Sequence, residues 1–213
     1  LFFLLLQFNQ FLIGQIGYGG GISTMDAIGL DFPRRIGANA FVELPRNEVN
    51  SFYLRASIMV PTVTSGNATA EIIDFNNLPP GEPSVITLDA ENRSSYISLD
   101  GGTRVYLYNT YDAGFALFGS ITLKGIYSKY KRRFSEFDTD LYAVTEGSFD
   151  DEFGLFMGVS GNLGVKYQLP MSGDILLDLG IDLLRSLTPN SIMGNELAPV
   201  SFCVNLSYRF NAY

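Results

Sequence analysis

The fold is decided by a stretch near the end of the chain, PVSFCVNLSYRFNAY, which runs from Pro199 to Tyr213. Apolar residues occupy every second position, namely Phe202, Val204, Leu206, Tyr208 and Phe210. Polar or small residues lie between them, namely Ser201, Cys203, Asn205, Ser207 and Arg209. Because successive side chains of a strand point to opposite faces, this pattern predicts a strand with one apolar and one polar face. Such a strand can close a barrel either in water or in lipid.

The same alternation recurs upstream and predicts seven more strands. We expect them at residues 15–23, 35–44, 51–61, 94–109, 114–130, 153–169 and 174–185. The connections alternate between short turns and long loops. The short turns are 45–50, 110–113 and 170–173, and the long loops are 24–34, 62–93, 131–152 and 186–198, with one short hairpin strand, VITL, inside the second. An even meander with both ends and every tight turn at one rim is typical of a membrane-spanning barrel.

The first 14 residues, LFFLLLQFNQFLIG, form the one long apolar run of the sequence. This run is shorter than the roughly 20 residues that a spanning helix needs, and it fits the apolar part of a secretory signal. We therefore expect residues 1–14 to be the remnant of a signal peptide and residues 15–213 to form the barrel. The alternative is an ordered apolar segment or a first strand.

Composition argues against several classes of function. The chain of 213 residues has a net charge of −8, which argues against general nucleic-acid binding. It contains no His, so the commonest general base and the commonest metal ligand are both missing. No GxSxG motif is present either. We expect no enzymatic activity and no cofactor or metal.

The two faces of the predicted strands differ in charge. The polar faces carry ionisable residues in mid-strand: Arg55, Asp100, Arg104, Lys124, Lys166, Asp178 and Asp182. The apolar faces carry almost none, and aromatic residues fall towards their ends. This distribution favours apolar faces in contact with lipid and a charge network in the lumen, where buried charges must pair. Because eight strands enclose just enough space for side chains, we expect a plugged lumen rather than a path for solutes.

A basic run lies at the end of the strand predicted at 114–130. It consists of Lys129, Lys131, Arg132 and Arg133. At the outer rim of a barrel these cations could meet the phosphates of lipopolysaccharide. The alternative is a solvated rim without a ligand.

From residue 15 to the end, the chain resembles the small eight-stranded outer-membrane barrels of the OmpA/OmpX type. The resemblance rests on the loop-length alternation, the two-residue repeats and the segment LSYRF, and the style of the sequence is similar to that of barrels from Bacteroidetes. It implies an all-β, eight-stranded antiparallel up-and-down transmembrane β-barrel in the outer membrane of a Gram-negative bacterium. LSYRF is similar to the C-terminal signal that the barrel assembly machinery reads, which would assign Leu206, Tyr208 and Phe210 to that signal. The pattern departs from the usual form because three residues follow Phe210.

The expected function is therefore a structural or interaction role, one form of which is an accessory subunit of a larger outer-membrane complex. Expected partners are outer-membrane lipid and lipopolysaccharide, the assembly machinery during insertion, and other envelope proteins. Two alternatives remain open: a narrow pore for small solutes, and a soluble ligand-binding barrel with its apolar face inward.

Overall fold

A computed structural model of the chain is built from ten β-strands. It describes residues 16–28, 34–74, 79–145, 152–170, 173–188 and 200–211. The strands are β1 (Gly17–Ala27), β2 (Arg35–Pro45), β3 (Asn50–Met59), β4 (Thr62–Ile72), β5 (Val85–Tyr108), β6 (Phe115–Phe134), β7 (Tyr142–Val144), β8 (Glu152–Leu169), β9 (Gly173–Ser186) and β10 (Val200–Asn211). Within the described residues, no helix has the length and apolarity that crossing a membrane requires.

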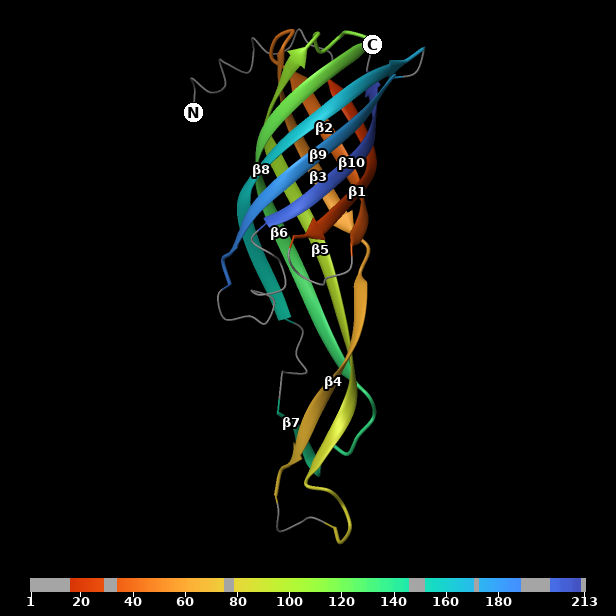
Figure 1. Cartoon of the computed structure of the whole chain (residues 1–213), viewed down its shortest axis with the longest axis vertical. Coiled ribbons are helices and arrows are strands. Elements are labelled where there is room, and N and C mark those ends of the chain that lie inside the picture. The colour runs from red at the N-terminus through yellow and green to blue at the C-terminus, as the bar shows by residue number, and fades with distance from the viewer. Residues whose placement is uncertain are drawn as a thin grey trace.

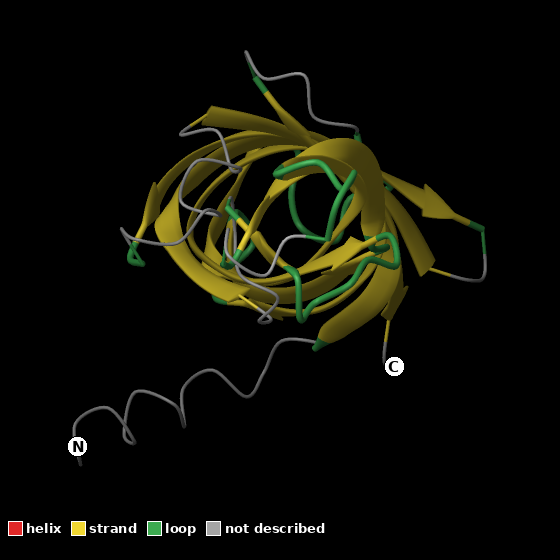
Figure 2. Cartoon of the chain, turned by 90° about the horizontal axis from the view of Figure 1, so that it is seen from below, coloured by secondary structure: helices red, strands yellow, loops and turns green. Residues whose placement is uncertain are grey.

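Eight of the strands form a closed antiparallel ring in the order β1-β2-β3-β5-β6-β8-β9-β10. The ring closes where β10 pairs with β1, from Gly17 opposite Asn211 to Ala27 opposite Ser201. Seen nearly end-on, the strands surround one central axis (Figure 2). The prediction of an eight-stranded antiparallel barrel is confirmed. We call the end with Gly17 and Asn211 the terminal rim and the opposite end the far rim.

The alternating sequence pattern becomes an inside and an outside. On β2 and β3, buried and exposed residues alternate almost without interruption. Apolar residues take the outward positions, so that Leu163 is 65% exposed, whereas Arg104 and Asp178 are 2% and 3% exposed inside the ring. A water-soluble barrel would show the reverse arrangement, so the soluble ligand-binding alternative is wrong.

Aromatic side chains gather on the outer wall near the terminal rim. Tyr18 stacks on Phe210 with ring centroids 5.6 Å apart, and Tyr108 meets Phe115 edge-on at 6.3 Å. Near the far rim, Tyr127 also points outward. Aromatic girdles of this kind mark the two interfaces of a lipid-facing apolar band.

A strand-built extension continues the wall beyond the far rim, where the sequence predicted loops (Figure 1). The predicted loop 62–93 contains β4 and the first part of β5, which pair from Thr62 opposite Ser94 to Glu71 opposite Val85. The predicted loop 131–152 contains the end of β6, which pairs with β5 up to Phe134, and β7, which pairs with β4. Both loop predictions are wrong in this respect, although the VITL segment does form the start of β5.

The extension is stable as a sheet because it has its own small core. Its buried members are Ala70, Ile72, Leu88 and Tyr142, and five partly buried apolar residues pack against them. β3 and β4 pair in succession with the 24-residue β5. Pro61 lies between them and has no N–H to donate, so the ladder is interrupted there.

The remaining boundaries differ little from the predictions. β1 runs on to Ala27, and β9 begins at Gly173. The expected signal peptide, residues 1–14, lies outside the described residues, as do residues 29–33 of the predicted loop 24–34 and residues 189–198 of the predicted loop 186–198.

Candidate functional site

The lumen holds a chain of ion pairs that begins at the terminal rim. β9 contributes Asp174, Asp178 and Asp182 to the inner wall, one at every fourth residue. Arg209 of β10 binds Asp174, with Nε 2.7 Å from Oδ2, and it also reaches Glu43 of β2 at 3.2 Å. Three strands are thus joined through one guanidinium group.

The chain continues across the barrel through Arg104 and Arg55. Arg104 of β5 binds Glu43 at 2.9 Å and Asp178 at 3.5 Å. Arg55 of β3 binds the same carboxylate of Asp178 at 3.1 Å and Asp100 of β5 at 3.1 Å. Each of these charges is at most 4% exposed, so the attraction acts in a poorly hydrated space.

Lys124 of β6 closes the chain on the side of the far rim. Its Nζ atom lies 2.6 Å from Asp182 and 3.9 Å from Asp100. Basic and acidic groups therefore alternate without a break from Asp174 to Asp182. Because an uncompensated buried charge is strongly destabilising, each member of the chain depends on its neighbours.

All seven charged residues that the sequence assigned to the lumen lie inside the barrel, and six belong to the ion-pair chain. Lys166 is the exception, since it donates a hydrogen bond to the backbone carbonyl of Tyr111. The sequence analysis missed Glu43, Asp174 and Arg209, which complete the chain. Their positions on the inward faces of predicted strands were a signal that could have found them.

Two apolar layers share the lumen with the ion-pair chain. The layer towards the far rim consists of Met25, Met59, Tyr96, Ile126, Tyr130, Phe156 and Leu184. The layer towards the terminal rim consists of Phe41, Tyr106, Tyr111, Ala116, Phe118 and Leu176. Arg104 also lies over the ring of Phe118, 4.1 Å from its centroid. The described apolar side chains and ion pairs thus pack together inside the ring.

A second candidate site lies on the outer wall at the far rim, where β5 and β6 leave the barrel. Arg93 pairs with Lys131 across the two strands, Ser95 pairs with Lys129, and Glu91 pairs with Arg133. Together with Pro61 these residues line a pocket of about 240 Å³, which we call the rim pocket. It combines four cations with one carboxylate, so it favours anionic groups.

The structure divides the predicted basic run between two faces. Lys129, Lys131 and Arg133 line the rim pocket, and Arg93 joins them from β5. Arg132 occupies the opposite face of β6, where its guanidinium group lies 5.5 Å from the ring of Phe134. Consecutive residues of a strand cannot share a face, so the run could never have acted as one surface.

The three residues of the predicted C-terminal signal lie on the outer wall of β10. Leu206 and Phe210 are exposed, and Tyr208 packs edge-on against Phe210 with centroids 4.7 Å apart. Cys203 of the same strand faces the lumen and is a free thiol. In the described ranges no group of three or more His, Cys, Asp and Glu side chains is placed to hold a metal ion.

A closed eight-stranded ring with an apolar, aromatic-girdled exterior and a paired ionic interior defines an integral outer-membrane β-barrel. No protein-family model matches the chain, and no curated protein has a similar sequence.

Solved structures with a similar arrangement include a surface protein, an outer-membrane protein and an attachment invasion locus protein. Neisserial surface protein A is 12% identical with a TM-score of 0.47, and the match covers 92% of this chain and 96% of that one. OprG from Pseudomonas aeruginosa is 12% identical with a TM-score of 0.47, over 93% and 97% of the two chains. Ail of Yersinia pestis is 12% identical with a TM-score of 0.44, over 92% and 97%. The function of this chain is therefore inferred from its own residues.

Proposed function

We propose that this protein is a non-enzymatic outer-membrane barrel whose working surfaces are its outer wall and its far-rim extension. The observation that carries this proposal is the filled lumen, in which a continuous chain of ion pairs packs together with two apolar layers. With its interior occupied, the barrel offers partners the wall, the far rim and the extension. An envelope protein that uses the barrel as an accessory subunit would bind there.

The far rim would face the outside of the cell. The first residue of β1, the last residue of β10 and the short turns lie together at the terminal rim, and short turns characterise the periplasmic side of such barrels. In this orientation the rim pocket lies next to the outer leaflet. Leu206, Tyr208 and Phe210 would then be presented to the assembly machinery from the periplasmic half of β10 during insertion.

The rim pocket would contact the phosphates of lipopolysaccharide. Lys129 lies one row beyond Tyr127, which is the last outward aromatic residue of β6, so the pocket sits at headgroup level. Each Lys or Arg near an anionic membrane surface contributes about 1 kcal/mol to binding.

Replacing both Lys129 and Lys131 with Gln is expected to weaken the binding of lipopolysaccharide by about 2 kcal/mol, or roughly 30-fold. The loss follows from removing two cations of the rim pocket while the strands keep their hydrogen bonds. Native mass spectrometry of the detergent-solubilised barrel, titrated with purified lipopolysaccharide, measures the affinity.

Arg132→Gln is the matched control, because it removes a neighbouring charge from the opposite face. It should leave the affinity within twofold of the wild type. An equal loss in both variants, or none in the double variant, would refute the lipopolysaccharide contact. Stable conductance steps of the wild-type protein in a planar bilayer would instead favour a narrow pore.

A further inference from the structure

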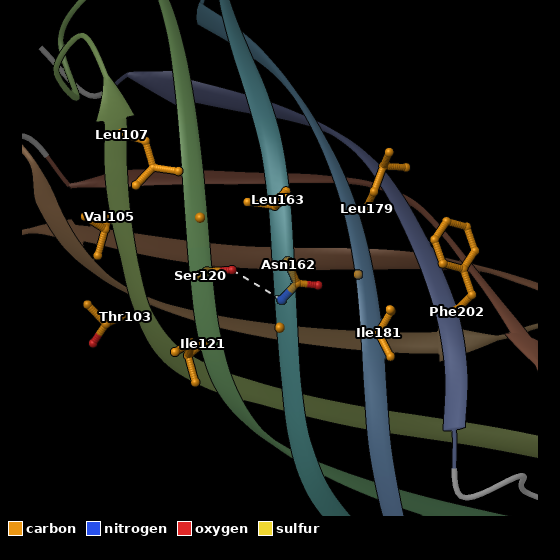
Figure 3. A pocket seen from close by; sticks show the side chains of 13 residues that line it. Thr103, Val105, Leu107, Ser120, Ile121, Asn162, Leu163, Leu179, Ile181 and Phe202 are labelled. Carbon is orange, nitrogen blue, oxygen red and sulfur yellow. Dashed lines mark hydrogen bonds between the residues drawn. The ribbon is translucent and has the colours of Figure 1, made fainter.

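The lipid-facing wall is hollowed by a groove that neither the lumen nor the rim pocket explains. The groove has a volume of about 700 Å³ and crosses β5, β6, β8, β9 and β10. Figure 3 shows Leu107, Ile121, Leu163 and Leu179 standing at its sides, with Phe202 at one end. Ile121 is 75% exposed, so these walls project from the barrel.

Two outward glycines, Gly119 and Gly161, line the groove together with the inward Gly180, and at the two outward positions the packing of the barrel does not require glycine. A Cβ atom at Gly161 would meet no other atom within 4 Å, and the same is true at Gly125, further along the outer face of β6. Inward glycines differ, because a Cβ atom at Gly158 or Gly164 would collide with neighbouring groups. Glycine inside a strand often marks a place where another molecule approaches closely.

The groove lies below the rim pocket on the same two strands. β6 contributes Ile121 to the groove and Lys129 to the pocket, and Gly125 lies between them on the same face. At a rise of about 3.3 Å per residue and a tilt of about 40°, the two sites are about 20 Å apart along the membrane normal. Half of the hydrocarbon core is about 15 Å thick and the headgroup region adds about 5 Å, so a chain whose phosphate lies in the pocket reaches the near edge of the groove with its end.

We propose that the groove seats the end of one acyl chain of a phosphorylated, acylated glycolipid whose phosphate occupies the rim pocket. This inference rests on the proposed contact with lipopolysaccharide and specifies how the lipid lies. The four cations of the pocket select a lipid with a phosphate at that height, and the apolar groove receives its hydrocarbon. Between the two sites, Gly125 leaves a gap on the outer face of β6 with Leu123 and Tyr127 on either side, along which the chain would pass.

Gly161→Leu tests the proposal, because Gly161 lines the groove and its new Cβ atom would meet no other atom within 4 Å. The probes are a bisphosphorylated lipid A with full-length acyl chains and its fully deacylated, water-soluble headgroup, each titrated by native mass spectrometry. We expect Gly161→Leu to weaken binding of the acylated probe by about 5-fold to 10-fold and to leave binding of the deacylated probe unchanged. Ala40→Leu, on the outer face of β2 across the ring, is the control and should change neither.

The other outcomes separate the two proposals. If the double Lys variant binds both probes more weakly while Gly161→Leu binds both as tightly as the wild type, the headgroup contact stands and the acyl-chain seat is wrong. If the double Lys variant keeps both probes, the lipopolysaccharide contact itself is wrong. Equal loss of both probes in Gly161→Leu, or a change in its oligomeric state in nanodiscs, would overturn the acyl-chain seat in favour of a structural effect or a protein interface.

Discussion

Arg104→Met is expected to destabilise the barrel by about 3–5 kcal/mol, the usual cost of removing one partner from a buried ion pair. The substitution leaves Glu43 with Arg209 and Asp178 with Arg55, each of which then has to compensate two neighbouring carboxylates. It also removes the cation that lies over Phe118. Methionine is apolar and of similar length, so lost packing contributes little to the expected effect.

Urea unfolding of the barrel in lipid vesicles, followed by tyrosine fluorescence and by the mobility of unheated samples on gels, measures this loss. Arg46→Met, in the exposed turn at the terminal rim, is the control and should change the unfolding free energy by less than about 0.5 kcal/mol. If Arg104→Met behaved like Arg46→Met, the ion-pair chain would not be holding the barrel together.

Leu163→Arg is expected to cost about 2–4 kcal/mol, because it places a charge at mid-height of the lipid-facing wall. Leu163 lies well inside β8, opposite Gly119 of β6 and Leu179 of β9, so its replacement cannot easily reach an interface. The same unfolding measurement in vesicles gives the free energy.

Thr87→Arg supplies the comparison for Leu163→Arg. Thr87 is exposed on the extension, outside the apolar band, so the added charge should be tolerated within about 0.5 kcal/mol. Similar costs at the two positions would mean that the wall around Leu163 does not face lipid.

The ring could be predicted from the sequence because lipid imposes a strict two-residue period on its strands. Leu163, Val165 and Tyr167 alternate with Asn162, Gly164 and Lys166, so one face was readable as apolar. Beyond the far rim this constraint disappears. The exposed face of β4 carries Ser65 and Asn67 in water, and small residues such as Ala68 form its buried face, so the segment resembled a polar loop.

The pairing within the lumen could not be predicted, because it depends on how far neighbouring strands are displaced along each other when the ring closes. Arg55 meets Asp178 across 123 positions of sequence, and no spacing rule selects that partner. The division of the basic run was predictable, since Arg132 must face away from Lys131 on any strand. That Arg93 lines the rim pocket could not be predicted, because its position beside Lys131 depends on the register between β5 and β6.

The central claim, that apolar faces meet lipid while charged faces fill the lumen, is tested most directly by spin labels on adjacent residues of β8. Labels at Leu163→Cys and Asn162→Cys, introduced separately into a Cys203→Ser background, are compared in lipid vesicles for collision with molecular oxygen and with a water-soluble nickel complex. The account predicts strong oxygen collision and little nickel collision at position 163, with both reagents largely excluded at position 162. High oxygen collision at 162 and a shielded label at 163 would contradict it.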